Sequence, residues 1–255
     1  MNAFARALRA ETLKMNRTLA LWLTLLTPAA LVFLEVVGAT QRQGQLSSLP
    51  PDINRWSLLF EDLFSIWVIL VFPLFITLET ALLGQVEHGN GTWKLVYTQP
   101  VPRWATLAAK QIWGLALVAL GMVALIVLTF IGGTILDILV PELAIEPPIP
   151  WKDIFTQVGI AILASGIILG VHTWIALRSR SFVVASAVGI TMTIAGLILA
   201  GLEWTKYFPW TMPGTALNNY HDGLSYGIYL VIGVVGWLVL SILANLELKR
   251  LEIRN

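Results

Sequence analysis

The longest apolar run of the chain reads TLAAKQIWGLALVALGMVALIVLTFIGGTIL and covers Thr106 to Leu136. A helix needs about 20 predominantly apolar residues to cross the roughly 30 Å hydrocarbon core of a membrane. Glycines such as Gly121 do not argue against a helix here, because membrane helices tolerate glycine better than soluble ones. A β-barrel would show alternating segments of about ten residues, whereas this run is continuous. The stretch therefore predicts a membrane-spanning helix.

Five further runs of this kind occur along the chain, so that six spanning helices are expected within a single transmembrane domain, residues 1–255. The predicted spans are about 19–39, 63–83, 106–136, 154–177, 182–202 and 225–244. The first is too long for the h-region of a signal peptide, which has 7–15 residues. We therefore expect an all-α integral membrane protein.

The composition excludes several classes of protein. Hydrophobic residues make up 57% of the chain and charged residues 12%, with a mean hydropathy of +0.78. Soluble domains carry about 25% charged residues, so a soluble enzyme is excluded, as are a disordered tail and a disulfide-rich module. The net charge of +1 argues against a nucleic-acid partner, because phosphate contacts need a concentrated basic surface. The absence of cysteine excludes disulfides and thiolate metal sites.

The distribution of Lys and Arg predicts the orientation in the membrane. With both termini inside, twelve of these residues lie on the cytoplasmic side and four outside, which accounts for all 16. Cytoplasmic segments carry an excess of Lys and Arg. We therefore expect cytoplasmic N and C termini.

The first 17 residues are expected to form an amphipathic helix in the cytoplasmic headgroup layer. Its apolar residues are predicted to cluster opposite its basic ones, and Phe4, Leu8, Glu11 and Met15 are not expected to form one stripe. The alternative is a basic flank that only sets the topology. The apolar cluster is Phe4, Ala7, Leu8 and Leu13, and the basic residues are Arg6, Arg9 and Lys14.

The segment from Gln85 to Arg103 follows the second predicted span and contains the breaker Gly89-Asn90-Gly91. Thr92 can then cap a short helix. Trp93, Val96 and Tyr97 would share one face of it by their i, i+3, i+4 spacing. A short helix with an aromatic face suits docking into a groove on a partner. The alternative is a connecting loop whose Trp and Tyr lie at the membrane interface.

Two outer segments complete the chain. Asp137 to Asp153 has four prolines and is expected to be extended. Glu203 to Leu224 is rich in aromatic residues and is expected to lie as a loop at the membrane interface. The alternative is that it folds back into the outer leaflet.

Residues with catalytic spacing are missing from the sequence. It contains no zinc-helix, nucleophile-elbow or phosphate-binding motif, and its three histidines lie in separate segments. We expect no catalytic residue and no metal site. The polar candidates inside the spans are Glu79, expected to reach water or a nearby cation such as Arg178, and His172, expected to be a hydrogen-bonded packing residue. Gly166 and Gly170 would let another helix approach closely.

These features together resemble the permease subunits of type 2 ABC exporters, in particular the lantibiotic-immunity and bacitracin-resistance group. The segment Leu8 to Lys14 resembles their amphipathic elbow helix. The segment Glu87 to Arg103, with an acid before Gly-Thr and a Pro-Val-x-Arg end, is similar to their first cytoplasmic loop with its coupling helix. Six spans in about 250 residues match the architecture of the family.

The resemblance implies a non-enzymatic transmembrane subunit of an ATP-driven exporter in the bacterial cytoplasmic membrane. Its partners would be cytosolic ATPase subunits, which would bind ATP and Mg²⁺, a second permease in a homodimer or a homologous heterodimer, and membrane lipids. Its substrates would be amphiphilic or hydrophobic, such as an antimicrobial peptide, a lipid or a drug. The alternative is a standalone secondary carrier or a membrane enzyme. The residues assigned to coupling are Glu87, Gly91, Thr92, Trp93, Lys94, Val96, Tyr97, Arg178 and Arg180.

Overall fold

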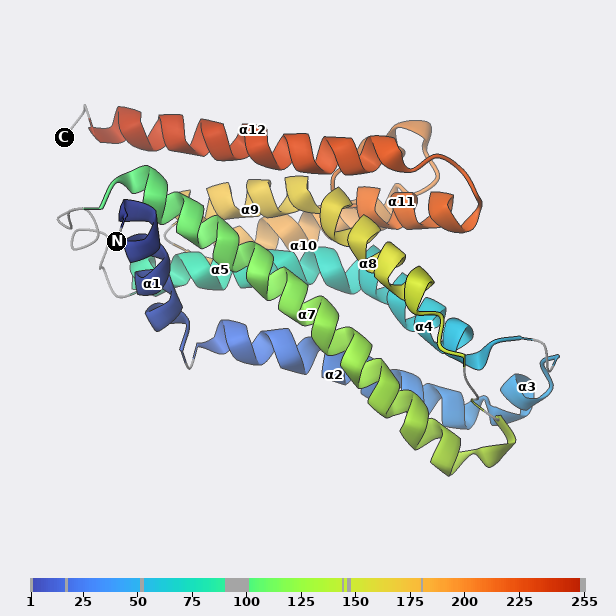
Figure 1. Cartoon of the computed structure of the whole chain (residues 1–255). Helices are drawn as coiled ribbons and strands as arrows, with labels where there is room; N and C mark the ends of the chain where they lie inside the picture. The colour runs from blue at the N-terminus through green and yellow to red at the C-terminus, as the bar shows by residue number, and fades with distance from the viewer. Residues whose placement is uncertain are drawn as a thin grey trace.

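The computed structural model is a bundle of helices, and its described residues contain no strand. It describes residues 2–16, 18–50, 53–89, 101–143, 145, 148–179 and 181–252, and the side chains in these ranges except those of 87–89 and 248–252. The chain runs back and forth along the bundle, and both termini lie at the same end (Figure 1). We call this the termini end. The opposite end, which carries α3 (Gln43–Ser47), is the distal end.

Four helices of the described chain are long and apolar enough to cross a membrane. They are α2 (Leu19–Gln41), the continuous helix Arg55–Val86, α7 (Arg103–Leu139) and α12 (Gly227–Glu252). A fifth span results if the bent pair α8 (Trp151–Ala164) and α9 (Gly166–Arg178) is one span. The apolar helix α10 (Phe182–Ile198) has 17 residues and ends before residue 202, where the predicted span ended. The structure thus supports a protein with four to five candidate spans.

The second predicted span, 63–83, is longer in the structure. Helix α4 (Arg55–Ile66) already begins at Arg55, because the side chain of Asn54 accepts a hydrogen bond from the Ser57 amide at 3.0 Å and caps the helix. A π-helical turn, η1 (Trp67–Val71), joins it to α5 (Phe72–Gly89). This turn directly precedes Pro73, whose nitrogen has no proton to donate to the preceding turn.

The fourth predicted span, 154–177, is bent by 43° where α8 meets α9. At the bend the Ser165 hydroxyl donates to the carbonyl of Ile162 at 2.9 Å. A Cβ atom on Gly166 would lie 2.6 Å from the carbonyl oxygen of Gly233 in α12, and one on Gly233 would lie 2.1 Å from that of Leu163. The expectation that glycines here allow close helix packing is confirmed, and the partner helix is α12.

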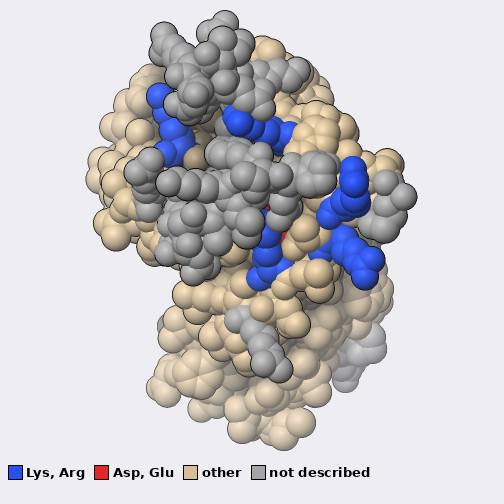
Figure 2. Space-filling view, turned by 90° about the vertical axis from the view of Figure 1, so that its left-hand side faces the viewer, with Lys and Arg blue, Asp and Glu red and all other residues tan. Residues whose placement is uncertain are grey.

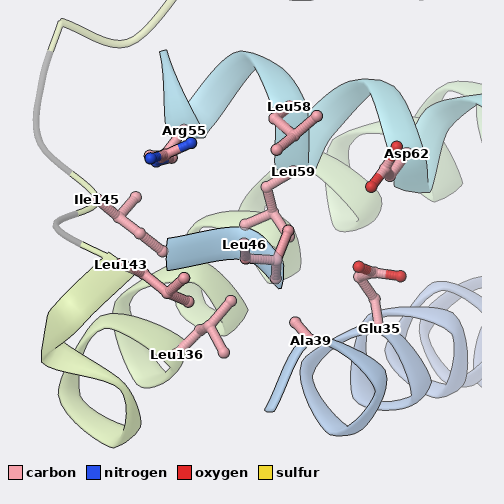
Figure 3. A pocket seen from close by; sticks show the side chains of 10 residues that line it. All are labelled: Glu35, Ala39, Leu46, Arg55, Leu58, Leu59, Asp62, Leu136, Leu143 and Ile145. Carbon is pink, nitrogen blue, oxygen red and sulfur yellow. The ribbon is translucent and has the colours of Figure 1, made fainter. Parts of the chain in front are cut away.

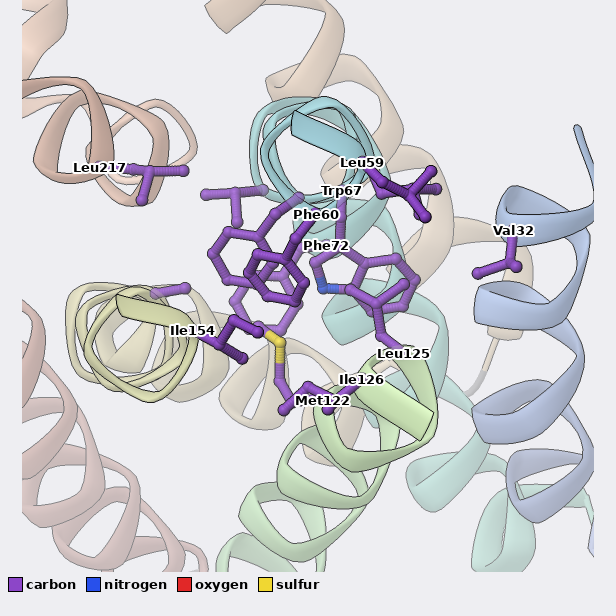
Figure 4. Packing of buried hydrophobic residues seen from close by; sticks show 14 of the residues in the cluster. Val32, Leu59, Phe60, Trp67, Phe72, Met122, Leu125, Ile126, Ile154 and Leu217 are labelled. Atoms are coloured by element: carbon purple, nitrogen blue, oxygen red, sulfur yellow. The ribbon is translucent and has the colours of Figure 1, made fainter. Parts of the chain in front are cut away.

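Aromatic and branched side chains fill the centre of the bundle (Figure 4). Trp67 and Phe72 contact each other and meet Met122 and Leu125 from α7, and all four are fully buried. Inside a membrane lipid tails are as apolar as these side chains, so close packing holds the helices together. The outward faces of α2 and α12 carry exposed leucine and valine, which suits contact with lipid.

The prediction that Glu203 to Leu224 forms a loop is wrong for much of this segment. It contains a 3₁₀ turn, η3 (Glu203–Tyr207), and a helix, α11 (Met212–His221), which packs against α8 and α12 (Figure 1). Trp210 is only 7% exposed and joins the central cluster, whereas Trp204 remains half-exposed. The hydroxyl of Thr211 closes the turn before α11 by donating to the backbone carbonyl of Thr205. The segment therefore folds back against the bundle.

Helix α1 (Ala3–Met15) crosses the first turns of α7 at the termini end (Figure 1). Asn2 caps it by accepting a hydrogen bond from the Ala5 amide at 2.8 Å. The predicted apolar grouping is wrong for Leu13, which is 71% exposed. The buried face consists of Ala7, Glu11 and Met15. Glu11 and Met15 therefore share one face of the helix, although they are not expected from the sequence to lie on one stripe.

Candidate functional site

The termini end is fastened by an ion pair buried between α1 and α7. The Lys110 ammonium lies 2.9 Å from one carboxylate oxygen of Glu11, and the two side chains are 2% and 1% exposed. The other carboxylate oxygen accepts from Lys14, one turn further along α1, at 2.6 Å. Lys110 also approaches the carbonyl oxygen of Leu83, in the last turns of α5, at 3.5 Å. One lysine therefore connects three helices.

Small and apolar side chains on either side of this pair allow the helices to lie close together. Ala7 of α1 packs with Ala105 and Ala109, which are one turn apart on α7. Met15, at the end of α1, packs against Leu83 of α5 and Leu117 of α7 in a second cluster. Water is thus kept from the charged groups, which strengthens their attraction.

The surface of the termini end is basic. Figure 2 looks onto this end and shows several Lys and Arg side chains on it. The exposed or partly exposed basic residues of the helices that meet here are Arg6, Arg9, Lys14, Arg103 and Arg178. A basic end of this kind suits the cytoplasmic side of a membrane protein.

Glu87 lies in the last turn of α5, and its side chain is not described. Most of the other predicted coupling residues lie outside the described part of the chain: Gly91, Thr92, Trp93, Lys94, Val96, Tyr97 and Arg180. Arg178 is described and lies at the termini end, where α9 ends. Its guanidinium pairs with Glu247 of α12 at 2.7 Å, and Trp174 donates to the same carboxylate at 2.6 Å. Arg178 and the helix ends around residues 90–100 thus belong to the same end of the molecule.

Glu79 is fully buried in the bundle. Its Oε1 atom lies 3.0 Å from the Thr24 hydroxyl of α2, and its Oε2 atom has no hydrogen-bond partner among the described residues. The Thr24 hydroxyl also lies 2.9 Å from the carbonyl of Ala20, the usual acceptor for a threonine inside a helix. The Thr24 hydroxyl is thus shared between the Ala20 carbonyl and the Glu79 carboxyl. Arg178, one of the cations expected beside Glu79, pairs with Glu247.

His172 is a buried packing residue, as expected. Its Nε2 atom lies 3.1 Å from the Thr77 hydroxyl, which is also 2.8 Å from the carbonyl of Pro73. Its ring meets Trp210 edge-on at 5.6 Å between centroids. Because Thr77 donates to Pro73, the proton on His172 belongs on Nε2. The contact joins α5, α9 and the segment before α11.

The distal end has a small pocket, open on one side to solvent, between α2, α4 and the end of α7 (Figure 3). Its walls are mainly leucine, and the carboxylates of Glu35 and Asp62 face each other across it. Arg42 pairs with Glu35 at 2.9 Å, and the guanidinium of Arg42 is 47% exposed. The lining residues are Glu35, Ala39, Leu46, Arg55, Leu58, Leu59, Asp62, Leu136, Leu143 and Ile145. Within the described residues, no group of three His, Asp or Glu side chains is placed to hold a metal ion.

Sequence reasoning missed Glu11 and Lys110 as site residues. Lys110 lies inside the predicted span 106–136, and a charged side chain in a span is a functional candidate by itself. Glu11 continues the i, i+4, i+7, i+11 spacing of Phe4, Leu8 and Met15, and this spacing was the signal that could have placed it on the inner face of α1.

The sequence matches the model of the ABC-2 family transporter proteins over residues 7–196, from the first helix to α10. The match covers well over half of the chain, including α1, Glu79, Lys110 and His172. The chain belongs to the ABC-2 family. No curated protein and no solved structure matches it.

Membership in the ABC-2 family makes this chain a membrane component of a transporter that is not itself catalytic. It also implies association with an ABC ATPase. The apolar helices agree with a location in the membrane. The ABC-2 match ends at residue 196, so α11 and α12 lie beyond it.

Proposed function

We propose that this chain is the transmembrane subunit of an ATP-driven exporter that moves amphiphilic or hydrophobic substrates out of the cell or the membrane. The observation that carries this proposal is the family match over residues 7–196 in a chain with an apolar helical bundle. Few charged residues are buried in that bundle, which suits an amphiphilic peptide, a lipid or a hydrophobic drug. The similarity of residues 87–103 to the lantibiotic-immunity and bacitracin-resistance group favours an antimicrobial peptide and a role in antibiotic resistance.

The topology that we propose has six spans with both termini in the cytoplasm. Helix α10 would be the additional span, since 17 residues reach about 25 Å, close to the roughly 30 Å of the hydrocarbon core. An even number of crossings agrees with both termini lying at one end of the bundle. The twelve-to-four distribution of Lys and Arg favours the cytoplasm for that end. Helix α1 would be the elbow helix of the family.

Coupling to the ATPase would take place at the termini end. Thr92 would cap the proposed coupling helix, with Trp93 and Tyr97 as its aromatic inserts and Glu87 and Lys94 as charges at its rim. The short segment from Arg178 to Arg180 would be a second contact. ATP and Mg²⁺ would bind to the ATPase subunits. A second permease, either another copy of this chain or a homologue, would complete the transporter in the bacterial cytoplasmic membrane.

The experiment is co-purification of the tagged permease with its ABC ATPase, followed by ATPase assays in proteoliposomes with a cationic antimicrobial peptide, a phospholipid and a hydrophobic drug. We expect a stable complex whose ATPase activity one of these substrates raises. Trp93→Ala with Tyr97→Ala should release the ATPase, since aromatic anchors at an interface each contribute about 2 kcal/mol or more. His88→Ala is the matched control. An ATPase that stays bound to the double variant with unchanged activity would contradict the coupling role.

A further inference from the structure

The buried pair Glu11–Lys110 joins residues that are 99 positions apart in the sequence. A charged group removed from water loses several kcal/mol of hydration, and only a well-placed opposite charge and further hydrogen bonds compensate for it. Both conditions are met here, because the second carboxylate oxygen of Glu11 accepts a hydrogen bond from Lys14 and Lys110 approaches a backbone carbonyl of α5. Helix α1 can therefore dock favourably only where Glu11 meets Lys110 on α7.

The position of α1 also explains why an acid lies on its inner face. A helix that only rested on a membrane surface would turn Glu11 towards water, together with Arg6 and Arg9. Here Glu11 is 1% exposed while both arginines are exposed. The inner face of α1 is thus complementary to α7 and not to lipid.

The helix ends that α1 contacts are the two that flank residues 90–100. Met15 touches Leu83 in α5, and Ala7 touches Ala105 and Ala109 in α7. Any force that reaches the end of α5 or the start of α7 is therefore passed to α1 through packed, small side chains and one ion pair.

We infer that Glu11 and Lys110 are positioning residues which make α1, the end of α5 and the start of α7 one rigid unit that moves together during transport. This inference rests on the proposed function, since it assigns a mechanical role to the coupling end of an exporter. The pair acts through the helices and contacts neither nucleotide nor substrate.

The test uses the natural lack of cysteine. Ala7→Cys combined with Ala105→Cys, and separately with Ala109→Cys, places a disulfide across the contact of α1 with α7. Cross-linking yield in membranes reports docking of α1 without any ATPase. Transport per ATP hydrolysed by the complete transporter reports coupling.

We expect the cross-link to form readily and to leave transport intact, because the two helices move together. Glu11→Gln should weaken the docking equilibrium of α1 by about a hundredfold or more, the size expected when one partner of a buried pair is removed, and should lower the cross-linking yield and the transport per ATP with it. The disulfide should restore coupling to Glu11→Gln, and a reductant should abolish that rescue. If Glu11→Gln does not insert into the membrane, Glu11→Asp, which keeps the charge, replaces it in the same two assays. Glu35→Gln is the matched control at the distal end.

Two results would overturn the inference. One is a cross-linked transporter that stops transport and recovers with reductant, since α1 would then have to leave α7. The other is a Glu11→Gln protein with normal cross-linking yield and normal coupling. If the unmodified complex shows no ATP-dependent transport, the proposed function fails, while the cross-linking yield still decides whether the pair docks α1.

Discussion

The two ends of the bundle are built in opposite ways. At the termini end, Glu11 and Lys110 are almost inaccessible, and alanines bring α1 directly against α7. At the distal end, Glu35 pairs with a half-exposed Arg42, and a cavity separates α2 from α4. The charged pair is thus buried at the termini end and partly exposed to water at the distal end.

This difference indicates where the molecule transmits force and where it yields. A closely packed end with desolvated charges has few alternative arrangements, because any shift exposes or separates the charges. At the distal end the ion pair is partly exposed to water, so a shift of the helices there changes its hydration less. In an exporter driven from the cytoplasm, the rigid end would receive the motion and the looser end would open.

Removing one charge from the termini end should have the largest effect on stability. We expect Lys110→Met to lower the free energy of unfolding by about 3–5 kcal/mol, because Glu11 is left buried with Lys14 alone. The double variant Glu11→Leu with Lys110→Met should recover most of that loss. Unfolding of the purified protein in detergent measures both. Equal losses in the two variants would mean that the pair is not the source of the effect.

The contact between Thr24 and Glu79 tests whether, deeper in the bundle too, removing one partner of a buried polar pair costs more stability than removing both. Thr24→Val should cost about 1–3 kcal/mol, since it leaves the carboxyl of Glu79 without its one hydrogen-bond partner. Thr24→Val with Glu79→Leu should be nearly neutral in the same unfolding assay. A single variant as stable as the natural protein would show that Glu79 reaches water.

Matched enlargements of alanine compare the packing of the two ends. Ala109→Met should destabilise the protein by about 1–3 kcal/mol, because Ala109 is fully buried between α1 and α7. Ala39→Met should cost less than Ala109→Met, because Ala39, although 1% exposed, borders the small distal pocket, which can take up part of the longer side chain. The comparison fails if the two substitutions cost the same.

The smallest effect is expected for the distal ion pair. Glu35→Gln should lower stability by less than about 1 kcal/mol, and that loss should vanish in high salt, because Arg42 is half-exposed. Thermal unfolding at two salt concentrations measures it. A loss as large as that of Lys110→Met would remove the contrast between the ends.

The sequence predicts the apolar helices and the glycine contact well, because each depends on residues that are neighbours along one helix. Gly166 and Gly170 indicate a close helix partner through their spacing, although they do not identify α12. Prediction from the sequence fails where a contact joins segments that are far apart along the chain. Lys110 satisfies Glu11 from 99 residues away, and Trp210 enters the core because α11 folds back against α8.

Limits of helices were harder to predict than their presence. Hydropathy places a span near residue 63, but the helix begins at Arg55 because Asn54 supplies a cap. In the same way, a continuous apolar run hides the bend at Ser165, which depends on close packing against α12. Caps and tertiary contacts are invisible to an average over apolar residues. The coupling residues 91–97 lie outside the described chain and remain a prediction.

Coupling to an ATPase requires that the termini end lies in the cytoplasm. Asn16→Cys at the end of α1 and Ser48→Cys after α3 place single exposed thiols at opposite ends of a protein with no cysteine of its own. In intact cells, a membrane-impermeant thiol reagent should label Cys at position 48 and should label position 16 only after the membrane is opened. Labelling of position 16 from outside, with position 48 protected, would contradict the account.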